Sequence, residues 1–368
     1  MTANPAWAAE SAAAIPREAT RHAEPARWLI PALAAGVVLV SILGLGLGAV
    51  AIAPGQVAAI LAAPFGLDLP WSYSRLESSV LLNIRLPRVL LGALTGAGLS
   101  LGGAWMQALF RNPLADPGLI GVSSGAAAAA AAFTVLGGAL PAGAVLFATW
   151  GLPAAAVIGG WLMALLVVRL ASTGGRVRVD HMLLAGIAIN TLAGAVIGLL
   201  MLIANDAQLR EVAFWSFGSL GRADEPILLA VGLTAVPLIL AGLLCAPWLN
   251  ALLLGENEAA LLGVPVERLK HLAIAFTCLA VGSSVAFTGL IGFVGLVAPH
   301  MVRLLIGSDH RRLLPAAALM GAILLPLADV LSRTVAAPVE LPIGLVTALL
   351  GAPFFLGLLL REQRRQPS

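Results

Sequence analysis

Residues 86–117 read LPRVLLGALTGAGLSLGGAWMQALFRNPLADP, and their composition indicates the class of fold. From Val89 to Leu109 it carries no charged residue and is rich in Leu, Ala and Gly. A helix that crosses the hydrocarbon core of a bilayer needs about 20 such residues. The run then stops at the polar, proline-containing segment 111–117. The pattern predicts a membrane-spanning helix that ends at a membrane surface.

Similar apolar runs fill most of the chain, which has 368 residues, 60% of them hydrophobic and 11% charged. Globular proteins average about 45–50% apolar and about 25% charged residues, so the composition excludes a soluble enzyme, a disordered protein and a nucleic-acid-binding protein. We expect an all-α polytopic membrane protein with about ten transmembrane helices, near residues 28–53, 86–109, 119–137, 144–169, 182–204, 226–248, 271–293, 296–307, 313–335 and 343–360. Residues 1–27 are expected to form a flexible cytoplasmic tail, 28–361 a single transmembrane domain, and 362–368 a C-terminal cytoplasmic tail.

The basic residues give the orientation, because cytoplasmic loops carry an excess of Lys and Arg. With both termini inside, fifteen of the 21 basic residues fall in cytoplasmic segments. The six on the outer side are Arg75, Arg85, Arg88, Arg210, Arg222 and Arg333. An even number of helices agrees with two cytoplasmic termini.

Two interruptions point to an internal repeat. The second span breaks at Arg111–Pro117 on the cytoplasmic side, and the seventh breaks at Gly289–Gly295 on the outer side. Each break precedes a short span. Paired interruptions of opposite topology indicate an inverted repeat, although glycine in a span can also serve only to let helices pack closely.

Little of the chain suggests enzymatic chemistry. A phosphate-binding loop needs Gly-Lys followed by Ser or Thr, but the single lysine, Lys270, lies between Leu269 and His271. No spacing of His and Cys suggests a metal site, and we expect no metal or cofactor on this chain. Asp329 is the one carboxylate that suggests ion coupling. Arg333 follows it by four residues on the same helical face, so a neutralised pair is the simpler interpretation.

The cytoplasmic segment 252–270, LLLGENEAALLGVPVERLK, has acidic residues at its start and basic residues at its end. Gly263 and Pro265 are expected to divide it into two short helices. Such an amphipathic pair is suited to contact a soluble partner; the alternative is a loop helix that lies on the bilayer surface.

These motifs resemble, in order, the permease subunit of type II ATP-binding-cassette importers, which carry iron-siderophores, haem and cobalamin. The resemblance covers nearly all of Leu29–Leu360. It begins with Arg85-Leu86-Pro87-Arg88 and with the family motif Arg111, Asn112, Pro113, Asp116 and Pro117. It continues through residues 183–187, 215–220, 254–256, 289–300, 309–311 and 328–329, and closes with Glu340-Leu341-Pro342-Ile343-Gly344.

The resemblance implies a homodimer in a bacterial inner membrane, with two ATP-binding subunits on the cytoplasmic face and a substrate-binding protein outside. ATP and Mg²⁺ would be used by the ATPase. The residues implied to contact the ATPase are Leu254, Gly255, Glu256, Ala259, Leu262, Gly263 and Val264. Arg85, Arg88 and Arg333 match basic residues that meet acidic residues on the binding protein. Alternatively, Arg85 and Arg88 only anchor a helix end, and Arg333 pairs with Asp329. Arg178, Val179 and Asp180 match the cytoplasmic gate, where relatives often have small hydroxyl residues instead.

The cargo is less well specified. The outer segment 208–221 most resembles haem permeases, so haem is the expected cargo, with a ferric siderophore or cobalamin as the alternative. An ion-coupled secondary transporter without an ATPase is the alternative from another class.

Overall fold

The computed structural model describes residues 27–137 and 145–363, and the predicted tails lie almost wholly outside this part. Within it, seven helices are long and apolar enough to span a membrane by length and composition. They are Arg27–Gly46, Arg75–Leu109, Trp150–Ala171, Val179–Ile203, Glu225–Leu244, Val266–Thr288 and His310–Thr334. Shorter apolar helices supply the third, eighth and tenth predicted spans, at Val122–Leu136, Val294–Ile306 and Ile343–Leu358. The prediction of an all-helical polytopic protein is confirmed.

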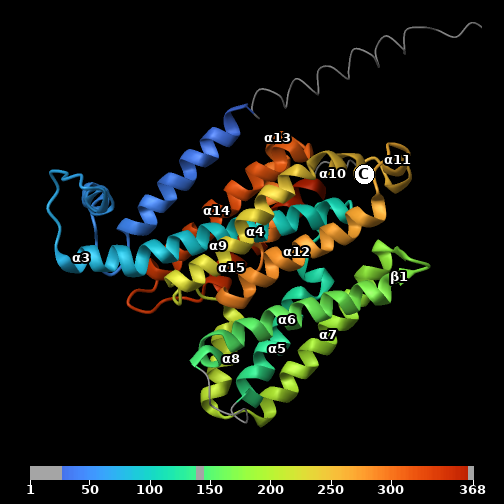
Figure 1. Cartoon of the computed structure of the whole chain (residues 1–368), viewed down its shortest axis with the longest axis horizontal. Helices are drawn as coiled ribbons and strands as arrows, with labels where there is room; N and C mark the ends of the chain where they lie inside the picture. Colours follow the sequence, from blue (N-terminus) through green and yellow to red (C-terminus); the bar gives the residue numbers. More distant parts are fainter. Residues whose placement is uncertain (1–26, 138–144, 364–368) are drawn as a thin grey trace, which may run out of the picture.

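Several helices are assembled from or flanked by shorter elements (Figure 1). The second span consists of α3 (Arg75–Val80), a π-helical turn (Leu81–Arg85) and α4 (Leu86–Leu109). The later long helices are α5 (Val122–Leu136), α6 (Val145–Ala171), α7 (Val179–Ile203), α9 (Glu225–Leu244), α12 (Val266–Thr288), α13 (Val294–Ile306), α14 (His310–Thr334) and α15 (Ile343–Gln363). The short elements are α2 (Pro54–Ala62), 3-10 turns at Ala63–Phe65 and Pro117–Ile120, strands β1 (Ser172–Thr173) and β2 (Arg176–Val177), α8 (Asp206–Phe217), α10 (Ala246–Leu252) and α11 (Glu256–Leu261).

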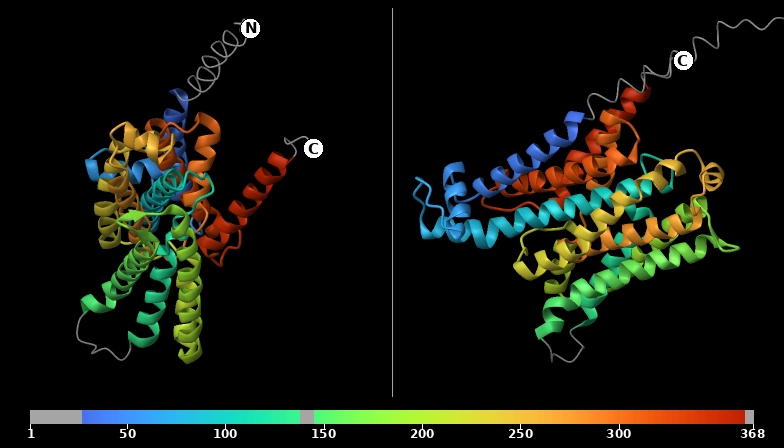
Figure 2. Two further views of the ribbon diagram at one scale, coloured as in Figure 1. Left: turned by 90° about the vertical axis from the view of Figure 1, so that its right-hand side faces the viewer. Right: turned by 45° about the horizontal axis from the view of Figure 1, so that its top comes forward.

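Three helices form the centre of the bundle. The most apolar windows of the second span, α12 and α14 are 83%, 72% and 72% buried, whereas those of α7 and α9 are 17% buried. Glycine permits α4 and α14 to approach each other closely, since a Cβ at Gly96 of α4 would overlap the backbone carbonyl of Gly321 in α14. Figure 2 shows α5, α6 and α7 as a separate group beside this centre. The exposed apolar faces of the outer helices are suited to lipid or to another membrane chain.

The helix contacts follow the predicted inverted repeat. α4 packs on α13 and α14, which follow the second break, and its counterpart α12 packs on α5 and α6, which follow the first. Among the described residues, the non-glycine residues with positive φ are Arg111 (48°) and Phe293 (67°), one in each predicted break. The first break lies beside the first turn of α12, and the second follows its last residue. The 23 residues of α12 span roughly 34 Å at about 1.5 Å per residue, so the breaks lie at opposite ends of the bundle.

The cytoplasmic helix pair differs from the prediction in its position. α11 lies inside the segment 252–270, but Pro265 caps α12, so the residues after it form the first turn of a long helix. The second short helix is α10, which precedes the segment. It forms because α9 ends at Leu244, Cys245 caps both helices, and Pro247 occupies the first turn of the new helix, where proline is favoured.

Candidate gating and coupling site

The predicted gate residues lie where a two-stranded hairpin leads into α7. The hairpin turns at Gly174 and Gly175, whose φ values of 60° and 77° are left-handed conformations that glycine adopts at little cost. Arg178 is the N-cap residue of α7, and its Nη2 lies 2.9 Å from Oδ2 of Asp180. These two side chains are 53% and 66% exposed, so their ion pair contributes little to stability.

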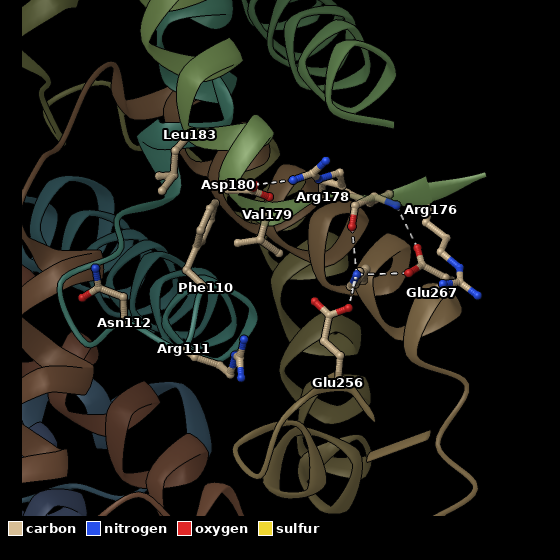
Figure 3. Close-up of a pocket in the computed structure, with 12 residues that line it drawn as sticks. Phe110, Arg111, Asn112, Arg176, Arg178, Val179, Asp180, Leu183, Glu256 and Glu267 are labelled. Carbon is tan, nitrogen blue, oxygen red and sulfur yellow. Dashed lines mark hydrogen bonds and ion pairs between the residues drawn. The ribbon is translucent and has the colours of Figure 1, made fainter. Parts of the chain in front are cut away.

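A cavity of about 510 Å³ opens beside the gate residues (Figure 3). Its walls come from the end of α4, the hairpin, the start of α7, α11 and the first turn of α12. The lining includes Arg111 and Asn112 of the family motif, Arg178, Val179 and Asp180 of the predicted gate, and Glu256 of the predicted coupling segment. The structure therefore brings together parts of three motifs that the sequence presents separately.

Lys270 joins these parts. It is 2% exposed, and its Nζ donates to the carbonyl oxygen of Val177 (2.8 Å), to Oε2 of Glu256 (2.6 Å) and to Oε1 of Glu267 (3.0 Å). An ammonium group has three donors, so all three are used. Oε2 of Glu267 also accepts the N–H of Val177 at 2.9 Å. We call Lys270, Glu256, Glu267 and Val177 the lysine cluster.

The family motif at 111–117 makes a compact turn between α4 and α5. The N–H of Leu114 donates to Oδ1 of Asn112 (2.9 Å), and that of Gly118 donates to Oδ1 of Asp116 (2.7 Å). Burial raises the pKa of the Asp116 carboxyl, while the bond from Gly118 acts in the opposite direction. Pro117 then begins the 3-10 turn that leads into α5.

The predicted coupling residues surround α11. Leu254 and Leu262 are 66% and 65% exposed, and their neighbour Leu261 is 89% exposed. Ala259 is fully buried, and its carbonyl oxygen accepts the N–H of Val264 at 3.0 Å. Gly255 and Gly263, with φ of 125° and 82°, flank the helix in conformations that disfavour other residues. Three exposed leucines around one short helix are typical of a protein-contact surface.

At the opposite end of the bundle, Arg88 holds two carboxylates. Its Nε donates to Oδ1 of Asp329 at 2.8 Å, and its Nη atoms bind both carboxylate oxygens of Glu340 at 3.2 and 3.0 Å. Arg333 Nε pairs with Oδ2 of Asp329 at 3.0 Å, which confirms the i,i+4 pair expected from the sequence. We call Arg88, Asp329, Arg333 and Glu340 the outer charge cluster.

Arg85 and Arg333 also cap the first described helix, Arg27–Gly46. Arg85 Nη1 donates to the carbonyl oxygens of Leu45 (2.7 Å) and Gly46 (3.0 Å), and Arg333 Nη2 donates to that of Gly44 (3.1 Å). The last carbonyl groups of a helix lack partners within it, and its dipole favours cations there. Arg85 and Arg88 are only 4% and 7% exposed as residues. The structure thus favours the alternative, an internal role, and direct docking through these arginines stays a prediction.

The segment 208–221 connects the second break to α15. The N–H of Ser219 donates to the carbonyl oxygen of Thr288 at 2.7 Å, and the N–H of Ile343 donates to that of Gly218 at 3.3 Å. Gln208 caps α8 and reaches the carbonyl oxygens of Thr134 and Val135. In this structure the hydrogen bonds of the segment link α5, α12 and α15, so its observed role is structural.

The comparison with known families settles the class of protein. The model of the FecCD transport family matches residues 36–361. The chain belongs to the FecCD transport family. This is a family of importer permease subunits, so the FecCD chain is a transport component and a multi-pass membrane protein.

Two curated relatives and one solved structure illustrate the likeness. The hemin transport system permease of Yersinia pestis is 48% identical over 285 residues, 77% of this FecCD chain and 84% of the relative. The vitamin B12 import system permease of Salmonella typhimurium is 41% identical over 340 residues, 92% of this chain and 96% of the relative. A structure described as an inward-facing metal-chelate type ABC transporter has a TM-score of 0.79 and 30% identity, and the match covers 90% of this chain and 98% of that one.

Family membership also bears on the ion-coupled alternative. Asp329, the carboxylate that best supported it, contacts two arginine side chains, and its own side chain is 2% exposed. Both carboxylate oxygens of Asp329 are thus engaged by arginine side chains, as expected for a neutralised ion pair. The FecCD assignment and this pairing together remove the support for that alternative.

Proposed function

We propose that this FecCD chain forms the membrane pathway of an ATP-driven importer for haem or another iron chelate. The pathway would be a homodimer in a bacterial inner membrane, with two ATP-binding subunits inside and a substrate-binding protein outside. ATP and Mg²⁺ would act only in the partner ATPase. The observation that carries the proposal is the exposed leucine surface of α11, next to the cavity where gate and motif residues meet.

Haem is favoured as cargo because the hemin permease shares 48% identity with this chain, against 41% for the vitamin B12 permease. The difference is modest, and both relatives handle large chelates. A ferric siderophore and cobalamin are the alternative cargoes, and the vitamin B12 permease, which aligns with 92% of this chain, favours cobalamin of the two.

The test of the transport reaction uses the permease reconstituted in liposomes with its ATPase and binding protein. Uptake of haem should require ATP and Mg²⁺ and should persist when ionophores collapse the ion gradients. Uptake that needs a gradient and no ATPase would contradict the proposal. Competition of haem uptake by cobalamin and by a ferric siderophore shows which of these chelates the transporter accepts. A shift of the Soret absorbance band when haem is added to the binding protein shows that this protein binds haem. Together the two measurements identify the cargo.

The ATPase contact has its own prediction. Leu262→Asp should weaken association with the ATPase by at least about tenfold, because an apolar interface contact is replaced by a buried charge. The measurement is the amount of ATPase that co-purifies with the permease across a concentration series. Arg169→Met, which changes an exposed residue at the end of α6, is the control and should bind normally. Equal retention of ATPase by both variants would show that α11 is not the contact.

A further inference from the structure

The lysine cluster lies between the surface proposed to meet the ATPase and the start of the helix proposed to carry the gate. Glu256 is the first residue of α11, and Val177 is the last residue of the hairpin. Arg178, the N-cap residue of α7, follows directly. Among the described residues, Lys270 Nζ hydrogen-bonds both to the α11 carboxylate and to the hairpin backbone.

The contacts hold Val177 firmly. Its carbonyl oxygen accepts from Lys270, and its N–H donates to Glu267, so both of its backbone polar groups are bound by side chains from the first two turns of α12. The side chain of Lys270 is 3% exposed, whereas those of Glu256 and Glu267 are 38% and 34% exposed. A buried ammonium is poorly screened by salt, and its hydrogen bonds to carboxylates are among the stronger ones in proteins.

The same contacts make Val177 sensitive to α11. If α11 shifts, Glu256 pulls on the ammonium group that holds the Val177 carbonyl. Val177 is joined by one peptide bond to Arg178, the N-cap residue of α7, so a displacement of Val177 acts directly on the start of α7. Displacement is therefore passed to residues 178–180.

We propose that Lys270 is a positioning residue that transmits movement of α11 to the start of α7 and so links the ATPase contact to the gate. This inference rests on the proposed function for the identity of the moving partner. The physical link between α11 and the hairpin does not depend on that identity.

The first test measures the link in the isolated permease. Spin labels are attached at Thr173→Cys in the hairpin and Leu261→Cys on α11, both exposed positions, in a background where Cys245 and Cys278 are replaced by Ala. Because the permease is proposed to be a homodimer, labelled chains are mixed with an excess of unlabelled, cysteine-free chains, so that most dimers carry one labelled pair. Double electron–electron resonance should then give one narrow distance distribution with Lys270 present. Lys270→Met should broaden or shift it.

The second test measures coupling in the full transporter with haem as cargo. Lys270→Met should reduce haem uptake per ATP hydrolysed by about tenfold, the scale of a charged hydrogen bond, while ATP hydrolysis stays within about twofold. Lys270→Met/Glu256→Gln/Glu267→Gln provides a second variant if the single variant folds poorly, since it also removes both half-buried carboxylates that would otherwise lose their partner. Arg169→Met removes an exposed cytoplasmic cation near the hairpin and should match the parent protein in both tests.

The outcomes separate the two proposals. An unchanged label distance together with parental uptake per ATP in both Lys270 variants would overturn the positioning role. If the parent transporter showed no ATP-driven uptake, the proposed function would fail, and the label distance would still decide whether Lys270 links α11 to the hairpin.

Discussion

Replacing Asp329 by asparagine is expected to destabilise the folded permease by about 3–5 kcal/mol, the usual effect of removing one partner from a buried ion pair. The asparagine keeps the shape of the side chain but loses the charge that faces Arg88 and Arg333. These two side chains are 9% and 8% exposed, so water cannot replace the lost carboxylate. Arg88 is on α4, and Arg333 also caps the first described helix. Loss of the Asp329 charge should therefore weaken the contacts among α4, α14 and that first helix at the outer end of the bundle.

Glu340→Gln is the matched control, because Glu340 binds the same guanidinium group. Its side chain is 53% exposed, and exposed pairs contribute about 0–1 kcal/mol. Thermal unfolding in detergent, followed by the loss of monodisperse protein, should therefore show a much larger drop in Tm for Asp329→Asn than for Glu340→Gln. Similar shifts in both variants would mean that burial does not govern the strength of this cluster.

The architecture was predictable because the signals that define it are local. An apolar run of membrane-spanning length, a break at Arg111–Pro117 and its counterpart at Gly289–Gly295 are each visible in a short window. The residue types also revealed the pair of Asp329 and Arg333, since four residues along a helix place them on one face. Helix boundaries were less predictable: Pro265 was expected to separate two short helices, but it is the N-cap residue of α12.

The contacts that make the site were not predictable, because they join residues far apart in the chain. Nothing near Lys270 in the sequence indicates that it binds Val177, 93 residues away. The available signals were that it is the only lysine and that Glu267 lies one helical turn before it. Likewise, Arg85 was expected to face a partner, whereas its guanidinium group binds carbonyl oxygens some 40 residues earlier. Outer-side arginines look alike in sequence, and only burial distinguishes a docking residue from a helix cap.

Replacing Gly103 by alanine is expected to have the other large effect, because Gly103 marks the contact between α4 and the first turn of α13. A Cβ at Gly103 would overlap the carbonyl oxygen of Gly295 and lie 2.5 Å from its carbonyl carbon. Backbone atoms cannot move aside as a flexible side chain can. The cost should therefore reach or exceed the upper end of the about 1–3 kcal/mol typical of overpacking. We expect little folded Gly103→Ala protein in the membrane and no measurable haem uptake.

The inverted repeat supplies the control for this prediction. Gly282 of α12 faces the first turn of α5 much as Gly103 of α4 faces the first turn of α13, and both glycines are buried. A Cβ at Gly282, however, would lie 3.9 Å from Cγ1 of Val122, an ordinary van der Waals distance. Gly282→Ala should therefore fold and transport normally, as judged by fluorescence-detected size exclusion and by haem uptake. If both alanine variants behaved alike, the two halves would pack with equal clearance, and the close approach of α4 to Gly295 would not be a requirement of the fold.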